Sequence, residues 1–358
     1  MKRATVQLGD FLTLKRGYEL PEHARLPGEI PVISSSGVTG THKEAKVYGP
    51  GVVTGRYGTL GEVFYIDEPF WPLNTALYVQ DFKGNHRRFV SYFLRWVLNG
   101  TQSDKAAVPG VNRNDLHARK VQVPDDLSEQ AEIASVLSAY DDLIENNRRR
   151  IQLLEQAARL LYKEWFVHLR FPGHEHTRII DGVPEGWERQ SLGEFATILK
   201  GKNITKETIE EGDVPVVAGG LKPAYYHNAA NASGPVITVS ASGANAGHVA
   251  LYHQDVWASD CSYLSSSDNS EIWFLYLSMK YCQAEITGMQ QGAAQPHVYP
   301  KHLKRLGLLL PPRNLLDLFK ETVEVCFLQI ANLEKQTEKL AKARDLLLPK
   351  LMNGEMVV

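Results

Sequence analysis

Residues 128–165 read SEQAEIASVLSAYDDLIENNRRRIQLLEQAARLLYKEW, and their apolar residues recur in alternating steps of four and three. This spacing is the heptad signature of a coiled-coil seam, so the stretch predicts one long helix. Adding 186 to each position gives a second apolar stripe near the C-terminus, which predicts a second long helix. The expected seam positions are Ile133, Leu137, Tyr140, Ile144, Ile151, Leu154, Ala158, Leu161 and Trp165, and then Phe319, Val323, Cys326, Ile330, Leu333, Leu340, Leu347 and Leu351.

Polar residues interrupt both stripes. Asn147 lies in the first seam, where a polar side chain commonly fixes the register of two helices; the alternative is an ordinary exposed position. Thr337 and Arg344 are the polar positions of the second stripe. Pro349 lies near the end of the second helix and is expected to kink or fray it, because proline lacks the backbone N–H that a helix needs.

The segments that precede the two helices are related to each other. LGDF at 8–11 recurs as LGEF at 192–195, an offset of 184, and Trp71 matches Trp257 at an offset of 186. Offsets that drift by so little over ordered anchors indicate one shared fold with small loop insertions. The chain therefore contains the same domain twice.

Each copy combines short strands with helical stretches. Residues 52–66 and 235–253 alternate apolar and small residues between Gly, Ser and Asn, which predicts strands joined by tight turns. The aromatic-rich stretches 89–98 and 272–282 predict helices. A second helix that starts from the second domain and packs on the first helix must run back along it. The predicted fold class is therefore α+β, with two similar globular domains separated by two long antiparallel coiled-coil helices in pseudo-twofold symmetry. The expected parts are a first domain at 1–125, a first helix at 126–170, a linker at 171–190, a second domain at 191–312 and a second helix at 313–358.

Composition sets limits on the class of protein. Hydrophobic residues make up 43% of the chain and the net charge is −2. Residues 1–125 hold sixteen basic and twelve acidic residues, whereas residues 186–312 hold nine and eleven, so charge alone does not indicate a nucleic-acid partner. No apolar run reaches the roughly 18–20 residues of a membrane span, and the start is not a signal peptide, so no membrane partner and a cytoplasmic location are expected. Cys261, Cys282 and Cys326 lack CxxC spacing and are interpreted as small buried hydrophobes.

The motifs of several enzyme classes are missing from the sequence. Gly201-Lys202-Asn203 lacks the upstream glycine and the hydroxyl of a nucleotide-binding P-loop. Leu310-Pro311-Pro312-Arg313 keeps only the prolines of an amino-methyltransferase motif. His174-Glu175-His176 could ligate a metal, but its polar surroundings favour a solvated loop. We therefore expect a chain without catalytic or metal-binding residues.

Four strings, in order around the duplicated domain, carry a family resemblance. They are SEQAEIASVLSAYDDLIENN at 128–147, LYKEWFVHLRFPG at 161–173, PEGWERQSLGEF at 184–195 and LLLPKLMNGEM at 346–356. Over nearly the whole chain the sequence resembles the specificity (S) subunit of type I restriction–modification enzymes. The resemblance implies two target-recognition domains that each read one half of a split target in double-stranded DNA. It also implies docking of two methyltransferase (M) subunits and of restriction (R) subunits. This chain then binds no cofactor itself, and the partner subunits use S-adenosylmethionine, ATP and Mg.

Candidate DNA contacts follow from the chemistry of base and phosphate recognition. Arg, Lys, Asn, Gln and Ser can reach base edges or phosphates, and glycine turns let the backbone approach closely. The candidates gather in the turn after residue 55 and its counterpart at 240–245, in loops after two matched strands, in a polar loop before the last strand of each domain, and in two basic pairs. They are Lys15, Arg16, Ser35, Ser36, Arg56, Tyr57, Lys105, Asn112, Arg113, Lys200, Lys202, Ser240, Ser242, Asn245, Gln290, Gln291, Gln295 and His297.

The same residues also fit interpretations without a DNA contact. Arg56 fits a tight hairpin with a surface arginine, and the polar loops fit ordinary loop solubility. Two other functions are possible for the whole chain: an enzyme with unrecognised motifs, and a non-catalytic coiled-coil scaffold that does not read DNA. The scaffold accounts for the two helices but not for the duplicated domains with their glycine turns. The sequence therefore favours a DNA-reading adaptor.

Overall fold

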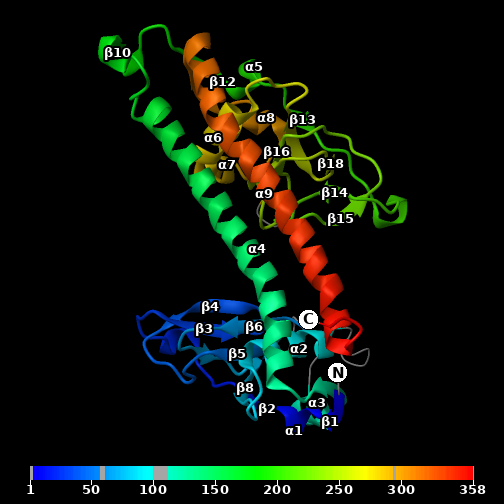
Figure 1. The fold of residues 1–358 in the computed structure, drawn as a ribbon. Coiled ribbons are helices and arrows are strands. Elements are labelled where there is room, and N and C mark those ends of the chain that lie inside the picture. Colours follow the sequence, from blue (N-terminus) through cyan, green and yellow to red (C-terminus); the bar gives the residue numbers. More distant parts are fainter. Residues whose placement is uncertain (1–2, 57–60, 100–111, 293–295, 358) are drawn as a thin grey trace. The chain divides into compact units, whose positions relative to one another are not determined.

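The structure is a computed structural model of the 358-residue chain, and it describes residues 3–56, 61–99, 112–292 and 296–357. The chain forms two compact units, residues 1–146 with 336–358 and residues 147–335, whose elements are labelled in Figure 1. The helices α4 (Leu127–Tyr162) and α9 (Arg313–Asn353) contribute residues to both units.

The described residues of the first unit form three small sheets. A four-stranded antiparallel sheet has the order β2-β8-β5-β6, a mixed sheet has the order β4-β3-β7, and β1 pairs with β9. The strands are β1 (Arg3–Gln7), β2 (Thr13–Arg16), β3 (Ile30–Ser34), β4 (Gly37–His42), β5 (Gly51–Gly55), β6 (Val63–Ile66), β7 (Trp71–Pro72), β8 (Ala76–Asp81) and β9 (Lys120–Pro124).

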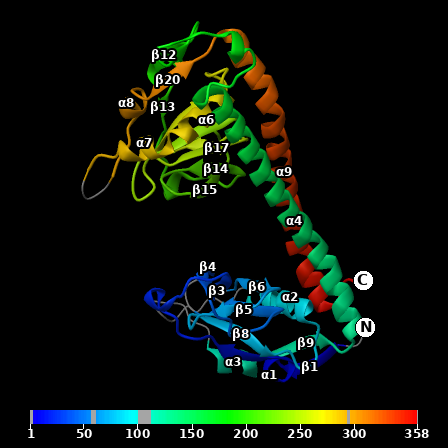
Figure 2. The ribbon, with the colours of Figure 1, turned by 90° about the vertical axis from the view of Figure 1, so that its left-hand side faces the viewer.

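The helix α2 (Arg87–Leu98) covers the four-stranded sheet of the first unit, as Figure 2 shows. It begins at the predicted aromatic stretch, and the His86 ring accepts a hydrogen bond from the Phe89 N–H at 3.3 Å. Phe89 and Phe93 are fully buried and pack against Phe11 of the short helix α1 (Leu8–Phe11). The repeated LGDF motif is thus a core element, which explains why it recurs.

The second unit repeats this plan. Its sheets have the orders β13-β19-β16-β17 and β15-β14-β18, and β12 pairs with β20. The strands are β12 (Glu188–Ser191), β13 (Leu199–Lys200), β14 (Val214–Val217), β15 (Tyr225–His227), β16 (Val236–Ser240), β17 (Val249–Tyr252), β18 (Trp257–Ala258), β19 (Cys261–Ser265) and β20 (Gly307–Leu310). The helices of this copy are α5 (Leu192–Phe195), α6 (Ile272–Tyr281), α7 (Gln283–Gly288) and α8 (Pro300–Leu303), and β10 (Ile179–Ile180) with β11 (Val183–Pro184) forms a hairpin inside the predicted linker.

The two copies agree down to single hydrogen bonds. Leu73 N–H donates to the Ile33 carbonyl at 2.8 Å, and Ser259 N–H donates to the Val217 carbonyl at 2.8 Å. Two matched glycines, Gly17 in the first unit and Gly201 in the second, lie against the same residues that donate these hydrogen bonds. A Cβ on Gly201 would lie 2.1 Å from the Ser259 carbonyl oxygen, and its counterpart in the first unit is equally crowded. Only glycine permits this close approach of two backbone segments.

The long helices pack against each other in opposite directions within each unit. In the first unit, Ile133 and Leu137 near the start of α4 share a core with Leu348 and Leu351 near the end of α9. Arg344 Nη1 donates to Asp141 Oδ1 at 2.6 Å in the same region. The predicted fold class, with two similar α+β domains and two long antiparallel helices, is confirmed.

In the second unit the end of α4 meets the start of α9. Tyr162, Trp165 and Phe166 form an aromatic cluster with Phe319 and with Phe274 of α6. After Tyr162 the chain continues in a π-helical turn, Lys163–Val167, and the C-terminal end of the predicted helix therefore departs from α-helical geometry. Packing of these large rings, more than helix propensity, holds the two helices here.

Burial along the helices follows the predicted seam. The buried positions include Ile133, Leu137, Ile144, Asn147, Phe319, Val323, Ile330 and Leu333, whereas Ile151, Leu154 and Leu340 are partly exposed. Asn147 is therefore not an exposed position. The prediction that Pro349 frays the second helix is wrong, because α9 continues past Pro349 to Asn353. The helix is followed by Gly354 in the left-handed conformation (φ +75°). The Glu355 N–H donates to the Lys350 carbonyl at 2.9 Å, which caps the helix.

Cys261 is buried, and Cys282 and Cys326 are partly buried. Burial raises the pKa of the Cys261 thiol to about 12, which keeps it protonated. Among the helices in the described part of the chain, none is both long and apolar enough to cross a membrane. His174–His176 forms a short 3-10 helix, and across the described ranges no three acidic, histidine or cysteine side chains gather into a metal site.

Candidate nucleic-acid interface

One turn organises the candidate residues of each unit. In the second unit it is the β18–β19 turn, residues 258–261. Lys202 N–H donates to the Ala258 carbonyl at 2.9 Å, and Ala241 N–H donates to the Asp260 carbonyl at 3.1 Å. Because the end of β14 also binds this turn, three segments that the sequence analysis selected separately lie around one point.

The candidate loops of the second unit are also tied directly to each other. Gly243 N–H donates to the Pro296 carbonyl at 3.2 Å, and Val298 N–H donates to the Ala241 carbonyl at 3.0 Å. Asn245 Nδ2 donates to the Gly219 carbonyl at 3.3 Å. The loop after β14, the β16–β17 hairpin and the described ends of the loop at 289–299 therefore form one continuous surface.

Several predicted contact residues hold this surface together. Ser240 is buried, and its hydroxyl donates to the Gly219 carbonyl at 3.2 Å. The Ser242 hydroxyl donates to the Asp260 carboxylate, and Gln290 Nε2 donates to the Ala246 carbonyl at 2.8 Å. These side chains fix the shape of the loops.

Gln291 and His297 stand where the loop at 289–299 leaves and rejoins the unit. Their backbones exchange two hydrogen bonds at 2.9 and 2.8 Å. Gln291 is exposed, and the His297 ring stacks on Tyr299 with centroids 5.6 Å apart and planes 10° apart. This pair presents an amide and a flat aromatic face at the edge of the loop surface. Gln295 lies outside the described residues.

The basic pair of the second unit flanks the same turn. Lys200 and Lys202 are both exposed, and they lie on either side of the crowded Gly201. The Lys202 ammonium lies 6.0 Å from the centre of the Trp257 ring, and the Trp257 indole N–H donates to the Lys202 carbonyl at 2.8 Å. The segment is therefore held by backbone and indole contacts, while both lysine side chains are exposed at the surface.

In the first unit the organising turn joins β7 to β8 at residues 72–76. Arg56 N–H donates to the Thr75 carbonyl at 3.0 Å, and Arg16 Nε donates to the Asn74 carbonyl at 3.2 Å. Lys15 is partly exposed with its ammonium 5.8 Å from the Tyr18 ring centre. Arg16 and Arg56 thus bind one turn directly, and Lys15 lies beside Tyr18, whose backbone N–H donates to the Pro72 carbonyl of the same turn at 2.8 Å.

Ser35 and Ser36 form the tight turn between β3 and β4. Ser36 is exposed and Ser35 partly so, while the Ser34 hydroxyl lies 3.0 Å from that of Ser36. The end of β3 binds the β7–β8 turn, so this serine turn belongs to the same surface.

Asn112 and Arg113 open the short helix α3 (Arg113–Ala118). The Asn112 Oδ1 accepts a hydrogen bond from the Asn114 N–H at 2.9 Å, which makes it the N-cap of the helix. Arg113 binds the Asn114 side-chain oxygen at 3.2 Å and is exposed. Tyr57 and Lys105 lie outside the described residues.

Sequence reasoning missed two residues of the second surface, Asp260 and Tyr299. Asp260 orients Ser242, and its position matches Thr75 of the first unit at an offset of 185. The search selected cations, amides and hydroxyls, and a carboxylate beside DNA did not meet that criterion. The repeat itself was the signal, because Thr75 and Asp260 occupy equivalent points in the two organising turns.

Comparison with known proteins places these observations in a family context. The family described as type I restriction modification DNA specificity domain matches residues 2–156 and 184–315. The type I restriction enzyme MjaIX specificity subunit of Methanocaldococcus jannaschii is 28% identical over 269 residues, which cover 67% of this chain and 62% of the relative. The type I restriction enzyme HindI specificity subunit of Haemophilus influenzae is 22% identical over 342 residues, which cover 71% of this chain and 73% of the relative.

One solved structure is similar over nearly its full length. The crystal structure of a type I restriction-modification system S subunit from M. genitalium has a TM-score of 0.62 and 18% sequence identity to this chain. The superposition covers 98% of this chain and 96% of that one. The two chains share a fold.

Proposed function

Since the chain belongs to the family of type I restriction modification DNA specificity domains, we propose that it reads a split target in double-stranded DNA. Each of the two repeated domains reads one half-site. The chain performs no methyl transfer or cleavage itself. Two methyltransferase subunits and restriction subunits dock on it and use S-adenosylmethionine, ATP and Mg.

The observation that carries this proposal is a shared scaffold with different side chains at equivalent points. Arg56 and Ala241 both donate their backbone N–H to the organising turn of their unit. The first position presents a guanidinium, which can bind the two acceptors of guanine, and the second presents only a methyl group. Different side chains on one scaffold select different bases, so the two half-sites are expected to be unrelated.

The surrounding residues supply positioning contacts. Lys15 and Arg16 in the first unit, and Lys200 and Lys202 in the second, carry charges suited to phosphates. Phosphate contacts make binding weaken steeply with salt, since each neutralised phosphate releases a counterion. This property separates a DNA reader from a coiled-coil scaffold, which has no salt-dependent affinity for DNA.

The test replaces Arg56 with glutamine in the complete methyltransferase complex and maps methylated positions in host DNA. We expect the bases of one half-site to change or relax, while the other half-site stays the same. Lys83→Gln, at an exposed position of the first unit beyond the end of β8 that lies opposite the organising turn, is the control and should leave the map unchanged. An unchanged map for Arg56→Gln, or changes in both half-sites at once, contradicts the proposal.

A second measurement addresses catalysis. The purified chain, given S-adenosylmethionine, ATP, magnesium and unmodified DNA, is expected to show neither methyl transfer nor strand cleavage. Its binding to duplex DNA should nevertheless fall as salt rises. Activity of the chain alone, or the absence of any DNA binding at low salt, would refute the adaptor function.

A further inference from the structure

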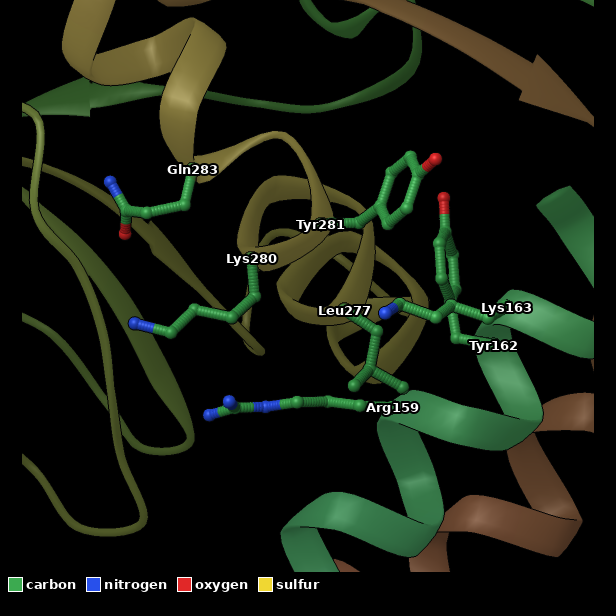
Figure 3. A pocket seen from close by; sticks show the side chains of 7 residues that line it. All are labelled: Arg159, Tyr162, Lys163, Leu277, Lys280, Tyr281 and Gln283. Atoms are coloured by element: carbon green, nitrogen blue, oxygen red, sulfur yellow. The ribbon is translucent and has the colours of Figure 1, made fainter.

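A pocket of about 420 Å³ lies beside the end of α4 in the second unit, away from the organising turn. Figure 3 shows its lining, which comes from α4, the π-helical turn that follows it, α6 and α7: Arg159, Tyr162, Lys163, Leu277, Lys280, Tyr281 and Gln283. Three of these seven side chains are cations. Arg159, in the last turn of α4, and Lys163, the first residue of the π-helical turn, are four residues apart and both line the pocket.

The charges of the pocket are only partly compensated. The Glu155 carboxylate lies 3.2 Å from Arg159 Nη2, which leaves two of the three cations without an ion pair among the described residues. Lys280 donates to the Val249 carbonyl at 2.7 Å, which holds its ammonium in place but does not neutralise it. Burial and the nearby Arg159 lower the pKa of Lys280, and burial and Lys280 lower the pKa of His248. Arg159 and Lys280 thus each raise the positive potential at a neighbouring basic group.

The shared scaffold keeps a basic residue at one of these three positions and does not require the other two cations, Arg159 and Lys163. Lys280 has a structural counterpart in Arg95, since Arg95 donates to the Val63 carbonyl as Lys280 does to that of Val249. The positions that match Arg159 and Lys163 at the helix offset of 186 are Asp345 and Pro349. Arg159 and Lys163 are therefore additions to the second unit. Arg159 and Lys163 are exposed, so packing does not account for them either.

We propose that this pocket binds a phosphate-bearing ligand. The guanidinium and the two ammonium groups that line this space suit the oxygens of one or more phosphate groups. Tyr281, half exposed, and Leu277 offer an apolar wall for the non-phosphate part of such a ligand. The phosphate can come from a free compound such as a nucleotide or from a nucleic-acid backbone.

The pocket also shares a wall with the candidate DNA interface. Gln283 Nε2 donates to the Gly247 carbonyl at 2.8 Å, and Gln283 Oε1 accepts from the Val249 N–H at 3.0 Å. Gly247 lies in the turn of the β16–β17 hairpin, and Val249 is the first residue of β17. A ligand held by Arg159 and Lys163 would therefore lie next to a loop that we assign to DNA reading, yet its binding does not depend on that assignment.

The test is isothermal titration of the full chain with sodium tripolyphosphate at low salt. The double variant Arg159→Gln/Lys163→Gln should bind at least about tenfold more weakly, because it loses two charge-assisted contacts. Arg148→Gln/Arg150→Gln is the matched control: it removes two exposed charges from the same helix outside the pocket and should bind within about twofold of the native chain. Circular dichroism melts establish that all variants are folded.

A random-sequence duplex then distinguishes the two sources of phosphate. If the duplex competes with tripolyphosphate, and if the pocket variant but not the control variant binds the duplex more weakly, the ligand is a nucleic-acid backbone. Tripolyphosphate binding that the duplex does not displace identifies a free phosphate compound. The proposal is overturned when tripolyphosphate fails to bind at millimolar concentration, or when the pocket variant binds it as tightly as the control variant.

Discussion

Replacing Asp141 with alanine should lower the free energy of unfolding of the first unit by about 3 kcal/mol. Asp141 Oδ1 accepts a hydrogen bond from Arg344 Nη1 at 2.6 Å, and its Oδ2 accepts one from the Tyr92 hydroxyl at 2.6 Å. Tyr92 is only 1% exposed, so loss of its acceptor leaves a buried hydroxyl without this partner. The carboxylate therefore links α4, α9 and α2 within one unit.

The magnitude follows from the kind of bond and its exposure. Hydrogen bonds to charged groups contribute about 1.5–3 kcal/mol each. The Arg344 and Asp141 side chains are 17% and 22% exposed, so solvent screens them in part and the low end of that range applies to both bonds. Asp142 is the control: its side chain is 77% exposed and lies 3.9 Å from Arg88, so Asp142→Ala should cost less than about 0.5 kcal/mol.

Urea unfolding followed by circular dichroism measures these differences. A double-mutant cycle of Asp141→Ala with Arg344→Met should give a coupling free energy of about 1.5 kcal/mol. A coupling near zero, or equal costs for Asp141→Ala and Asp142→Ala, would mean that the end of α9 does not close the first unit as described.

Three further predictions concern other parts of the chain. Inserting four residues into α4 after Arg150 lengthens a 36-residue helix by about 6 Å and turns it about 40° beyond one full turn. Methylation mapping should then show unchanged half-sites with a wider unread spacer, or no methylation. Altered half-sites with an unchanged spacer would contradict this prediction. Gly201→Ala places a Cβ 2.1 Å from a backbone carbonyl and should destabilise the second unit by about 1–3 kcal/mol in urea unfolding, whereas Gly288→Ala, which meets nothing within 4 Å, should not. Burial lowers the pKa of His253 from 6.5 to about 4. The folded state therefore binds fewer protons than the unfolded state, and the free energy of unfolding falls as the pH drops through this window. About 2 kcal/mol of that free energy should be lost between pH 7.5 and 5, and His253→Phe should remove this part of the pH dependence in urea unfolding.

The repeat allowed the sequence to predict the fold well. The LGDF and LGEF motifs bury Leu8 and Leu192 fully because each opens the same short helix against a core of aromatic rings. Heptad spacing located both long helices, since a seam needs apolar residues at fixed steps whatever the details of packing. Both features are repeats along the chain, so the sequence alone is enough to detect them.

The individual contacts depend on three-dimensional partners and could not be read in this way. Arg344 interrupts the second stripe as a polar position, yet it is a partly buried partner of Asp141, more than 200 residues away in the chain. Asn112 has the amide of a base reader but caps a helix. Sequence chemistry tells which groups can make a contact, and only the fold tells which of those groups are already used.

Whether each domain reads its own half-site is decided by exchanging residues 1–125 for the matching domain of a relative with a different target. The exchanged chain is assembled with its methyltransferase subunits, and the methylated positions in host DNA are mapped. The account predicts that one half-site takes the bases of the relative while the other half-site stays unchanged, because each domain reads alone. Both half-sites changing together, or neither changing, would contradict it.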